Sequence, residues 1–517
     1  MILPRSGGVM PRVVWIANCR AVFKTLITLI AFCSATFITL PAQTFTTLVE
    51  FDGKNGASPV SMSLIQGVNG DLYGTTLQGG ANCPPGGCGT VFQLSPKGLK
   101  TLYSLCALPS CTDGADPNAG LTQGTDGNFY GTNSSGGDFQ FGTVFKITPT
   151  GTLTILHSFC ITQTNCSDGA VPAGSLIQAI DGDFYGTTTA GGGVGPGCLI
   201  GGGCGTVFKM TSLGTLTTLH VFCSKGKCPD GAGPSTALVQ ATDGNFYGTT
   251  STGGNTRCQA PYGCGTVFRM NPTGKLTTIH TFCSQPDCTD GAIPLGVLVQ
   301  GVDGNLYGTT EGFGNGGTAF KITPDGTLTT IYTFCSLPGC SDGGGPVAGL
   351  IQATDGNFYG TTDGGGINGC SCGTIFTITS GGVLTTLHSF DGADGSHPYG
   401  SLFQSTNGSF YGATVNGGPY SCPDDPTCGT LYSLSTGLSP FVAFVRGSSK
   451  AGQSFGILGQ GFTGTTSAAL NGTPMSFTVV SDTFIKATVP AGATTGYVTV
   501  ATPSGTLTSN VPFHVLN

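Results

Sequence analysis

Short apolar stretches alternate with turn residues through most of this chain, and residues 176–222 illustrate the pattern. The four stretches are Leu176–Ala179, Phe184–Thr188, Gly205–Met210 and Leu216–Phe222. Asp181-Gly182 separates the first two stretches and Gly214 separates the last two. Glycines at these points supply the positive φ that short hairpins require. The pattern therefore predicts four antiparallel strands.

The same unit recurs seven times along the chain. Its tyrosine falls at Tyr73, Tyr130, Tyr185, Tyr247, Tyr307, Tyr359 and Tyr411, with spacings of 52 to 62 residues. Units that cannot bury their own apolar faces stack on copies of themselves. We predict an all-β fold, with a seven-bladed β-propeller of four-stranded blades over residues 43–437. A parallel β-helix competes, but its coils are shorter and lack two tight hairpins in each unit.

The two ends of the repeat array complement each other. Thr46–Phe51 match the fourth strand of a repeat, as in Thr385–Phe390, whereas Gly429–Leu434 match a third strand that no fourth strand follows. We expect residues 45–52 to supply the outermost strand of the last blade. In the alternative, residues 44–96 form one continuous blade, and pairing between Thr47 and the 430s separates the two interpretations.

Residues 441–517 carry a different pattern, which predicts a small Ig-like β-sandwich. Its characteristic pieces are Gly452–Gly459, Gly461-Phe462, Ala469–Gly472, Ile485–Pro490 and Gly496–Val500. Their order closely resembles the IPT/TIG immunoglobulin-like domain. That resemblance implies a spacer or adhesion-type module.

The first 42 residues indicate export. They contain four basic residues and no acidic one, and the apolar run Thr25–Leu40 precedes a small residue at Ala42. The run is shorter than the roughly 20 residues that a spanning helix needs. We predict a signal peptide over residues 1–42, no stable membrane span after its cleavage, and a secreted or cell-surface protein.

Charge argues against nucleic acid as a partner. Of 18 basic residues, 14 remain after the signal segment, against 25 acidic residues, so the mature chain has a net charge of −11. Phosphate binding requires clustered Lys and Arg, which this chain lacks.

Outside the signal segment the 20 cysteines fall into close pairs. The pairs are Cys83–Cys88, Cys106–Cys111, Cys160–Cys166, Cys198–Cys204, Cys223–Cys228, Cys258–Cys264, Cys283–Cys288, Cys335–Cys340, Cys370–Cys372 and Cys422–Cys428. Repeats that lack one member of a pair also lack the other, which predicts disulfides in an exported chain. Whether Cys370 bonds to Cys372 stays open, because a single residue separates them.

The predicted disulfides fall in two classes of loop, one between the second and third strands and one after the fourth strand. In a four-stranded antiparallel blade, these connections emerge on the same side. We therefore expect one face with long, disulfide-bonded loops, which marks the interaction surface.

Few residues point to chemistry. The turn aspartates Asp126, Asp181, Asp243, Asp303 and Asp355 are interpreted as turn formers, and His157, His220, His280 and His388 as packing residues, because Tyr and Val replace them in other repeats. Solitary polar residues on the expected loop face are Asp138, Arg257, Glu311, Asp363, His397, Asp424 and Asp425. Exposed loop aromatics are Tyr262, Tyr399, Tyr420, Phe139 and Phe313. We select Arg257, Glu311, Asp363, His397, Tyr262 and Tyr420 as binding candidates, and predict no catalytic residues, metal or cofactor.

The repeat array resembles the GloVer tandem-repeat proteins, bacterial surface proteins described as choice-of-anchor. Gly142–Thr148 and Asp243–Thr250 carry this resemblance, which extends over residues 45–436. It implies a surface location and no particular reaction. We expect a non-enzymatic binding or adhesion module for an extracellular glycan or protein. The alternatives are an extracellular polysaccharide hydrolase or lyase and a purely structural envelope protein.

Overall fold

A computed structural model describes residues 43–60, 63–82, 88–161, 166–192, 203–224, 226–258, 262–312, 316–422 and 427–516. The predicted signal peptide lies outside these residues. Within them the protein is all-β, and its only helical elements are three single 3₁₀ turns, η1 (Pro109–Cys111), η2 (Pro286–Cys288) and η3 (Pro338–Cys340). No helix in the described part is long and apolar enough to cross a bilayer.

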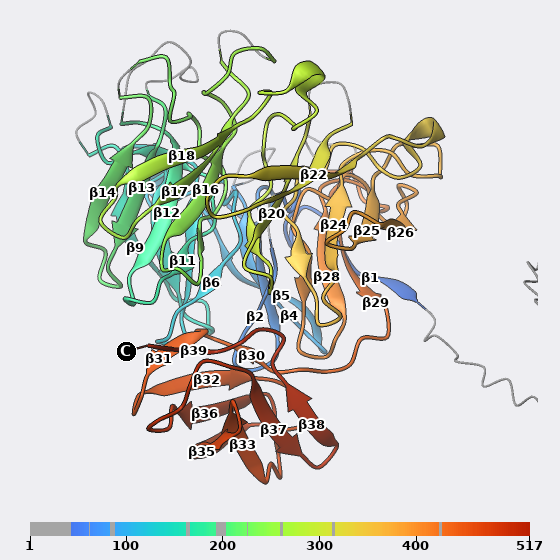
Figure 1. Ribbon diagram of the computed structural model, residues 1–517. Coiled ribbons are helices and arrows are strands. Elements are labelled where there is room, and N and C mark those ends of the chain that lie inside the picture. The colour runs from blue at the N-terminus through green and yellow to red at the C-terminus, as the bar shows by residue number, and fades with distance from the viewer. Residues whose placement is uncertain are drawn as a thin grey trace, which may run out of the picture. The chain divides into compact units, whose positions relative to one another are not determined.

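Each of the first six repeats forms an antiparallel sheet whose strands follow one another in chain order, as predicted (Figure 1). The first two sheets are β2 (Ile65–Gln66), β3 (Leu72–Thr76), β4 (Thr90–Ser95), β5 (Gly98–Ser104), and β6 (Thr122–Gln123), β7 (Phe129–Asn133), β8 (Thr143–Ile147), β9 (Leu153–Ser158). The third contains β10 (Ala170–Pro172), β11 (Ile177–Gln178), β12 (Phe184–Ala190), β13 (Thr206–Met210) and β14 (Leu216–Val221). The fourth contains β15 (Val239–Gln240), β16 (Phe246–Thr250), β17 (Thr266–Met270) and β18 (Leu276–Thr281). The fifth and sixth are β19 (Val299–Gln300), β20 (Leu306–Thr310), β21 (Thr318–Ile322), β22 (Leu328–Thr333), and β23 (Ile351–Gln352), β24 (Phe358–Thr362), β25 (Thr374–Ile378), β26 (Leu384–Ser389).

The first strand of each sheet is shorter than the sequence suggests. In the third repeat only Ile177 and Gln178 pair with β12, whereas the apolar pattern extends over Leu176–Ala179. Leu176 and Ala179 are buried without joining the ladder. The apolar side chains at these two positions are therefore explained by packing in the core and not by strand pairing.

A glycine inside the second strand permits close packing within each sheet. Gly186 on β12 lies opposite Phe208 on β13. A Cβ atom on Gly186 would lie 2.5 Å from the Phe208 ring, closer than side-chain atoms approach in proteins. The Phe208 ring is fully buried and covers the glycine. The Tyr-Gly-Thr sequence of the repeat thus provides space for the aromatic ring of the third strand.

The repeat tyrosine joins neighbouring sheets. The Tyr130 ring stacks on Phe184 of the next repeat, with centroids 4.0 Å apart. Equivalent ring pairs are Tyr73–Phe129, Tyr185–Phe246, Tyr307–Phe358 and Tyr359–Phe410, at 4.0 to 4.2 Å. The tyrosines are almost completely buried. Their role is therefore packing between repeats.

The last sheet combines the two ends of the array. It has the order β1 (Thr44–Glu50), β29 (Thr430–Ser435), β28 (Phe410–Thr414) and β27 (Phe403–Gln404). Strand β1 runs antiparallel to β29, with Thr47 opposite Tyr432. The fourth-strand position of this sheet is thus filled by a segment almost 400 residues earlier in the chain.

The first and last repeats also contact each other through side chains. The Gln66 amide donates a hydrogen bond to Thr406 at 3.1 Å, and the Gln66 carbonyl oxygen accepts one from the Thr406 backbone. Phe51, which follows β1, packs against Phe92 of the first repeat with ring centroids 5.9 Å apart.

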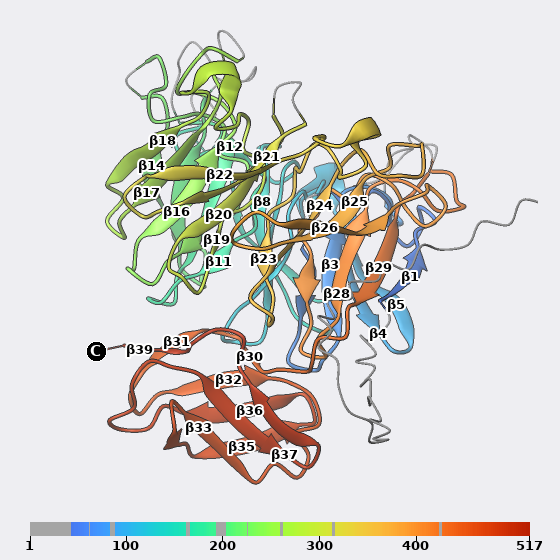
Figure 2. The ribbon, with the colours of Figure 1, turned by 45° about the vertical axis from the view of Figure 1, so that its right-hand side comes forward.

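The C-terminal strands form separate sheets with their own core (Figure 2). One sheet has the order β30 (Ala443–Phe444), β32 (Ser454–Leu458), β36 (Phe484–Thr488), β35 (Phe477–Ser481), and another β34 (Thr473–Pro474), β33 (Ser467–Leu470), β37 (Val498–Thr502), β38 (Gly505–Thr508). Strand β31 (Ser448–Lys450) pairs in parallel with β39 (His514–Leu516). Buried Phe462, Leu470, Ile485 and Phe513 belong to this core.

Candidate functional site

An aspartate organises the loop that leaves the fourth strand in six of the seven sheets. In the first repeat the Asp113 carboxylate accepts hydrogen bonds from the Ala107 and Leu108 backbone N–H groups at 2.8 and 3.1 Å. It also accepts one from the Tyr103 hydroxyl at 2.9 Å. Asp113 is buried. Three donors to one buried carboxylate hold this loop against its sheet.

Histidines replace the tyrosine in several repeats and contact the same aspartate. The pairs are His157–Asp168, His220–Asp230, His280–Asp290 and His388–Asp394, at 2.7 to 3.2 Å, with Tyr332–Asp342 at 2.8 Å in the fifth repeat. The interpretation of these histidines as packing residues alone is therefore incomplete. Each ring also provides a polar partner for a loop carboxylate.

The turn aspartates support the repeat tyrosines. Asp126 accepts hydrogen bonds from the Asn128 backbone N–H at 3.1 Å and from the Tyr130 hydroxyl at 2.9 Å. Burial opposes ionisation, but the hydrogen bonds from Asn128 and Tyr130 outweigh it and lower the pKa of Asp126. Burial, with the charge of Asp126, raises the pKa of Tyr130. These aspartates therefore form the turns and also accept hydrogen bonds from the hydroxyl groups of the repeat tyrosines.

Disulfides join eight of the ten close cysteine pairs. They are Cys106–Cys111, Cys160–Cys166, Cys223–Cys228, Cys258–Cys264, Cys283–Cys288, Cys335–Cys340, Cys370–Cys372 and Cys422–Cys428. Cys88 and Cys204 are also disulfide-bonded. Their sequence partners, Cys83 and Cys198, lie outside the described residues.

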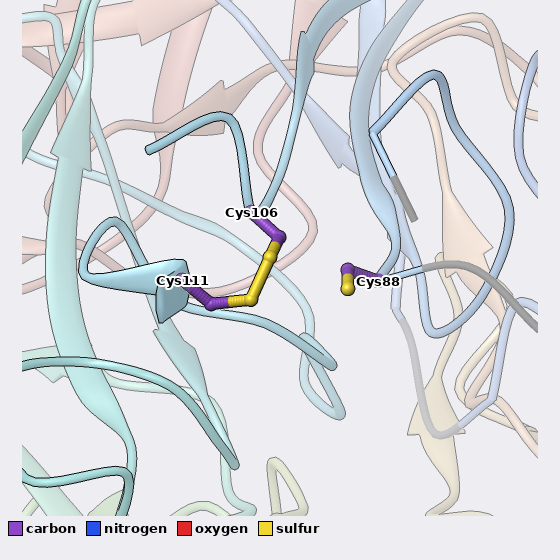
Figure 3. A group of neighbouring side chains, drawn as sticks. All are labelled: Cys88, Cys106 and Cys111. Carbon is purple, nitrogen blue, oxygen red and sulfur yellow. A yellow bond between two sulfur atoms is a disulfide. The ribbon is translucent and has the colours of Figure 1, made fainter. Parts of the chain in front are cut away.

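Two loops meet through sulfur in the first and third repeats. Cys88, from the segment before β4, lies beside the Cys106–Cys111 disulfide of the loop after β5 (Figure 3). All three Sγ atoms lie within 4.8 Å of one another. The two classes of cysteine-bearing loop are thus neighbours in space.

Three sequence-selected candidates come together at one place. His397 Nδ1 lies 2.8 Å from an Asp363 carboxylate oxygen, although the residues belong to different repeats. The negative charge of Asp363 contributes to a raised pKa of Glu311. Both carboxylates contribute to a raised pKa of Tyr399, so these side chains lie within electrostatic range of one another. From the sequence alone, Tyr399 is expected to be only a loop aromatic. The four residues, Glu311, Asp363, His397 and Tyr399, are called the acid–histidine cluster below.

The repeat geometry brings these residues together. Glu311 directly follows β20 and Asp363 directly follows β24, so they occupy the same position in neighbouring repeats. His397 lies in the loop before β27 and has a φ of 57°. Its backbone N–H donates to the Cys372 carbonyl at 2.9 Å, which fixes the loop beside the preceding repeat. The imidazole can therefore reach across to Asp363.

Glu311 is the exposed member of the acid–histidine cluster, whereas Asp363, His397 and Tyr399 are partly buried. Partial desolvation raises the pKa of Glu311, and the nearby negative charge of Asp363 raises it further. Burial also raises the pKa of Tyr399, with smaller contributions from Asp363 and Glu311. Within the described residues no Lys or Arg forms an ion pair with Glu311 or Asp363. Glu311 and Asp363 therefore offer carboxylate acceptors to a ligand, and only the His397 imidazole lies beside one of them in an ion-pair geometry within the described residues.

A small cavity of about 80 Å³ adjoins Tyr399. Its wall includes the residues that precede the first strands of several repeats, among them Ser63, Ser175, Ser235 and Ser401. Hydroxyl and backbone groups dominate this lining, so polar ligand groups such as hydroxyls find both donors and acceptors there.

The other candidates lie apart from the acid–histidine cluster. Arg257, Tyr262 and Tyr420 are exposed on the surface, and no contact joins them to the cluster in the described ranges. Asp138 is also exposed, whereas Phe139 packs beside the Cys160–Cys166 disulfide. Asp424, Asp425 and Phe313 lie outside the described residues.

Repeated four-stranded antiparallel sheets define a tandem-repeat, all-β protein. A fungal alcohol oxidase of the AA5 family, in complex with copper, aligns with a TM-score of 0.52 and 12% identity over 92% of this chain and 99% of that chain. An auxiliary nutrient binding protein from Bacteroides thetaiotaomicron aligns with a TM-score of 0.39 and 12% identity over 76% of each chain. The PQQ-bound aldose sugar dehydrogenase from Streptomyces coelicolor gives a TM-score of 0.36 and 12% identity over 61% of this chain and 93% of that chain. At these identities the likeness concerns the fold.

The sequence defines the family more closely. The family described as Gloeobacter/Verrucomicrobia repeat matches residues 35–200, 161–287 and 254–473. The chain therefore belongs to the Gloeobacter/Verrucomicrobia repeat family. None of the curated proteins matches it.

Proposed function

We propose that this protein is an exported, non-enzymatic binding or adhesion module that presents its disulfide-bonded loops on one face. The ligand is an extracellular glycan or protein. Disulfide-rich loops support a location outside the cytoplasm, because disulfides persist in oxidising compartments. Long loops on a rigid scaffold are the usual carriers of binding residues.

The architecture we propose is a closed seven-bladed β-propeller followed by an Ig-like domain of the IPT/TIG type. Closure is supported by the hydrogen bonds between Gln66 and Thr406 and by the Phe51–Phe92 contact, which join the first repeat to the last. Pairing of β1 with β29 supports a ring that the N-terminal strand completes. The two C-terminal sheets and their shared core support the sandwich.

The observation that carries the binding proposal is the convergence of Glu311, Asp363 and His397 beside Tyr399. Residues that form only the scaffold recur in most repeats, whereas an acid after the second strand occurs only as Glu311 and Asp363, and His397 and Tyr399 have no equivalents at their positions. A carboxylate pair, an imidazole and a phenol beside a hydroxyl-lined cavity suit a ligand rich in hydroxyl groups. We therefore favour a glycan over a protein.

The test uses the oxidised mature chain, residues 43–517, on a glycan array. We expect a defined subset of glycans to retain the protein, and the variant Glu311→Gln/Asp363→Asn/His397→Gln to lose that retention. Asp138→Asn changes an exposed candidate outside the cluster and serves as the control. Equal retention of the triple variant would place the ligand elsewhere, and no retention of the parent protein would remove the glycan proposal.

An extracellular polysaccharide hydrolase or lyase is the second candidate. Its supporting observation is Glu311, whose raised pKa beside a second carboxylate is the arrangement expected of a general acid. Incubation with each retained polysaccharide separates the two functions. Release of new chain ends by the parent protein, lost in Glu311→Gln, favours the enzyme, whereas retention without new ends favours the binding module.

Location and attachment form part of the same proposal. We propose that residues 1–42 are removed as a signal peptide and that the mature protein is secreted or held at the cell surface, as for choice-of-anchor proteins. A purely structural envelope protein remains the third interpretation. Such a protein would be abundant in isolated envelopes and would retain no glycan on the array.

A further inference from the structure

The third repeat contains a buried group of three sulfur atoms. Cys204 comes from the segment before β13, and Cys223 and Cys228 come from the loop after β14. Their Sγ atoms all lie within 4.8 Å of one another, and Cys204 Sγ lies 3.9 Å from Cys228 Sγ. At most 2% of each residue is exposed. Two disulfides, one containing Cys204 and the other Cys223–Cys228, therefore meet inside the protein.

We propose that Cys204 and the Cys223–Cys228 disulfide form a site of intramolecular thiol–disulfide exchange, which a dithiol reductant opens. The proposal is independent of the ligand. Exchange requires a thiolate that can reach one sulfur of a disulfide, and it proceeds through attack on that sulfur. Cys228 Sγ is the disulfide sulfur whose separation from Cys204 Sγ is 3.9 Å.

The reaction balances in two steps. The dithiol first reduces the Cys204 disulfide, becomes a disulfide itself and leaves two thiols on the protein. Cys204 loses its proton and attacks Cys228 Sγ, so the Cys204–Cys228 bond forms and the Cys223–Cys228 bond breaks. Cys223 leaves as a thiolate and takes up a proton. The second step transfers no further electrons, because one disulfide replaces another.

The exchanged bond has a different structural effect from the original one. Cys223–Cys228 closes a loop within one connection, with a sequence separation of 5. The Cys204–Cys228 bond would join two connections separated by 24 residues. Reduction of the Cys204 disulfide would thus replace a bond within one loop by a covalent bond between two loops of the third repeat.

Other repeats provide internal comparisons. The first repeat has the same arrangement in Cys88, Cys106 and Cys111, with all three partly exposed (Figure 3). In the second repeat, residues 131–142 contain no cysteine. Its Cys160–Cys166 disulfide is also buried, with 0% and 7% of the two residues exposed, and no further cysteine belongs to its cluster in the described residues. Cys160–Cys166 is therefore the matched control for a buried disulfide without a sulfur neighbour.

The experiment treats oxidised mature protein with substoichiometric dithiothreitol under native conditions, blocks free thiols with iodoacetamide at intervals and maps the bonds by mass spectrometry. We expect Cys204–Cys228 peptides with alkylated Cys223 to accumulate. Opening of Cys223–Cys228 should exceed that of Cys160–Cys166 by about tenfold, because an internal thiol acts at a millimolar effective concentration. Alkylated Cys204 together with an unchanged Cys223–Cys228 bond would overturn the proposal.

A variant isolates the role of the attacking thiol. The sequence pairs Cys198 with Cys204, so Cys198→Ser/Cys204→Ser is designed to remove this predicted disulfide without leaving an unpaired cysteine. We expect Cys223–Cys228 in this variant to open at the rate of Cys160–Cys166, with an unchanged circular dichroism spectrum. Continued rapid opening would show that solution reductant reaches Cys228 directly, and the exchange site would then be rejected. If the variant fails to fold, the bond map of the parent protein decides the question.

Discussion

The imidazole of His280 lies 3.2 Å from the carboxylate of Asp290, across the loop that leaves β18. Both side chains are mostly buried. The same relationship recurs in other repeats with either histidine or tyrosine on the strand, so the loop aspartate is the constant member of the pair. Its partner can change as long as it presents a polar hydrogen.

Replacing His280 with Tyr tests this equivalence through pH. Burial lowers the pKa of His280 more than Asp290 raises it, so the unfolded chain binds this proton at a higher pH than the folded protein does. Stability from this position is therefore present above the unfolded pKa, about 6.5, and is lost as the pH falls through that value toward the folded pKa. Tyrosine does not titrate in this range.

We expect His280→Tyr to lose less stability than the parent protein when the pH falls from about 7.5 to about 5.5, a range that lies on both sides of the unfolded histidine pKa. Thermal or urea unfolding at both pH values measures the difference. His280→Ala provides the comparison that removes both the titration and the hydrogen bond. An equal pH dependence of parent and tyrosine variant would contradict the assignment.

Removing a tyrosine hydroxyl should destabilise the protein more where the hydrogen-bond partner of that hydroxyl is charged. Tyr130 donates to the Asp126 carboxylate, whereas the Tyr411 hydroxyl accepts from the neutral Asn407 amide at 3.1 Å. We expect Tyr130→Phe to lower the free energy of unfolding by about 1.5–3 kcal/mol and Tyr411→Phe by about 0.5–1.5 kcal/mol. Urea unfolding of the two variants checks the order, and a reversed order would show that the charge of Asp126 adds nothing.

The N-terminal strand offers a test of how the array is held together. Phe51 is 1% exposed and packs on Phe92 of the first repeat, whereas Leu48 on β1 is 40% exposed. We expect Phe51→Ala to cost about 3–5 kcal/mol, the usual range for a buried phenylalanine. Leu48→Ala should stay within about 0.5 kcal/mol. Similar losses for both variants would argue against packing between the first and last repeats.

The repeat glycine predicts a local overpacking effect. A methyl group on Gly186 would lie 2.5 Å from the buried Phe208 ring, and the surrounding core leaves the ring no free space. Gly186→Ala should therefore destabilise the protein by about 1–3 kcal/mol. Gly447→Ala, where a Cβ meets no atom within 4 Å, is the control. Equal melting temperatures of the two variants would exclude this explanation of the Tyr-Gly sequence.

The strands were predictable because apolar periodicity and glycine turns are local signals. The histidine–aspartate pairs left a signal that the sequence interpretation missed. The first fourth-strand position holds Val49 in place of His or Tyr, and the matching loop position holds Asn55 in place of Asp. The Asn55 side chain still accepts from the Asp52 backbone N–H at 3.0 Å. The strand and loop positions thus change together, as expected of a contact.

The acid–histidine cluster was less accessible to sequence reasoning. In the sequence, Glu311 and Asp363 stand out only as solitary polar residues, although both follow the second strand of their repeats. Equal positions in successive repeats suggest proximity only once the stacking of the sheets is known. His397 reaches Asp363 because its loop lies against the preceding repeat, a relationship set by packing and not by spacing.

Strand β29 takes its outer neighbour from the beginning of the chain. During synthesis, a ribosome makes Thr44 long before Ser435, so β1 has no partner until nearly the whole array has left the tunnel. A prematurely terminated product would carry β1 without its partner β29, and unpaired strand edges invite association with other chains. An incomplete polypeptide therefore differs from the finished one at its first strand, which stays unpaired with β29 for as long as the last repeat is missing.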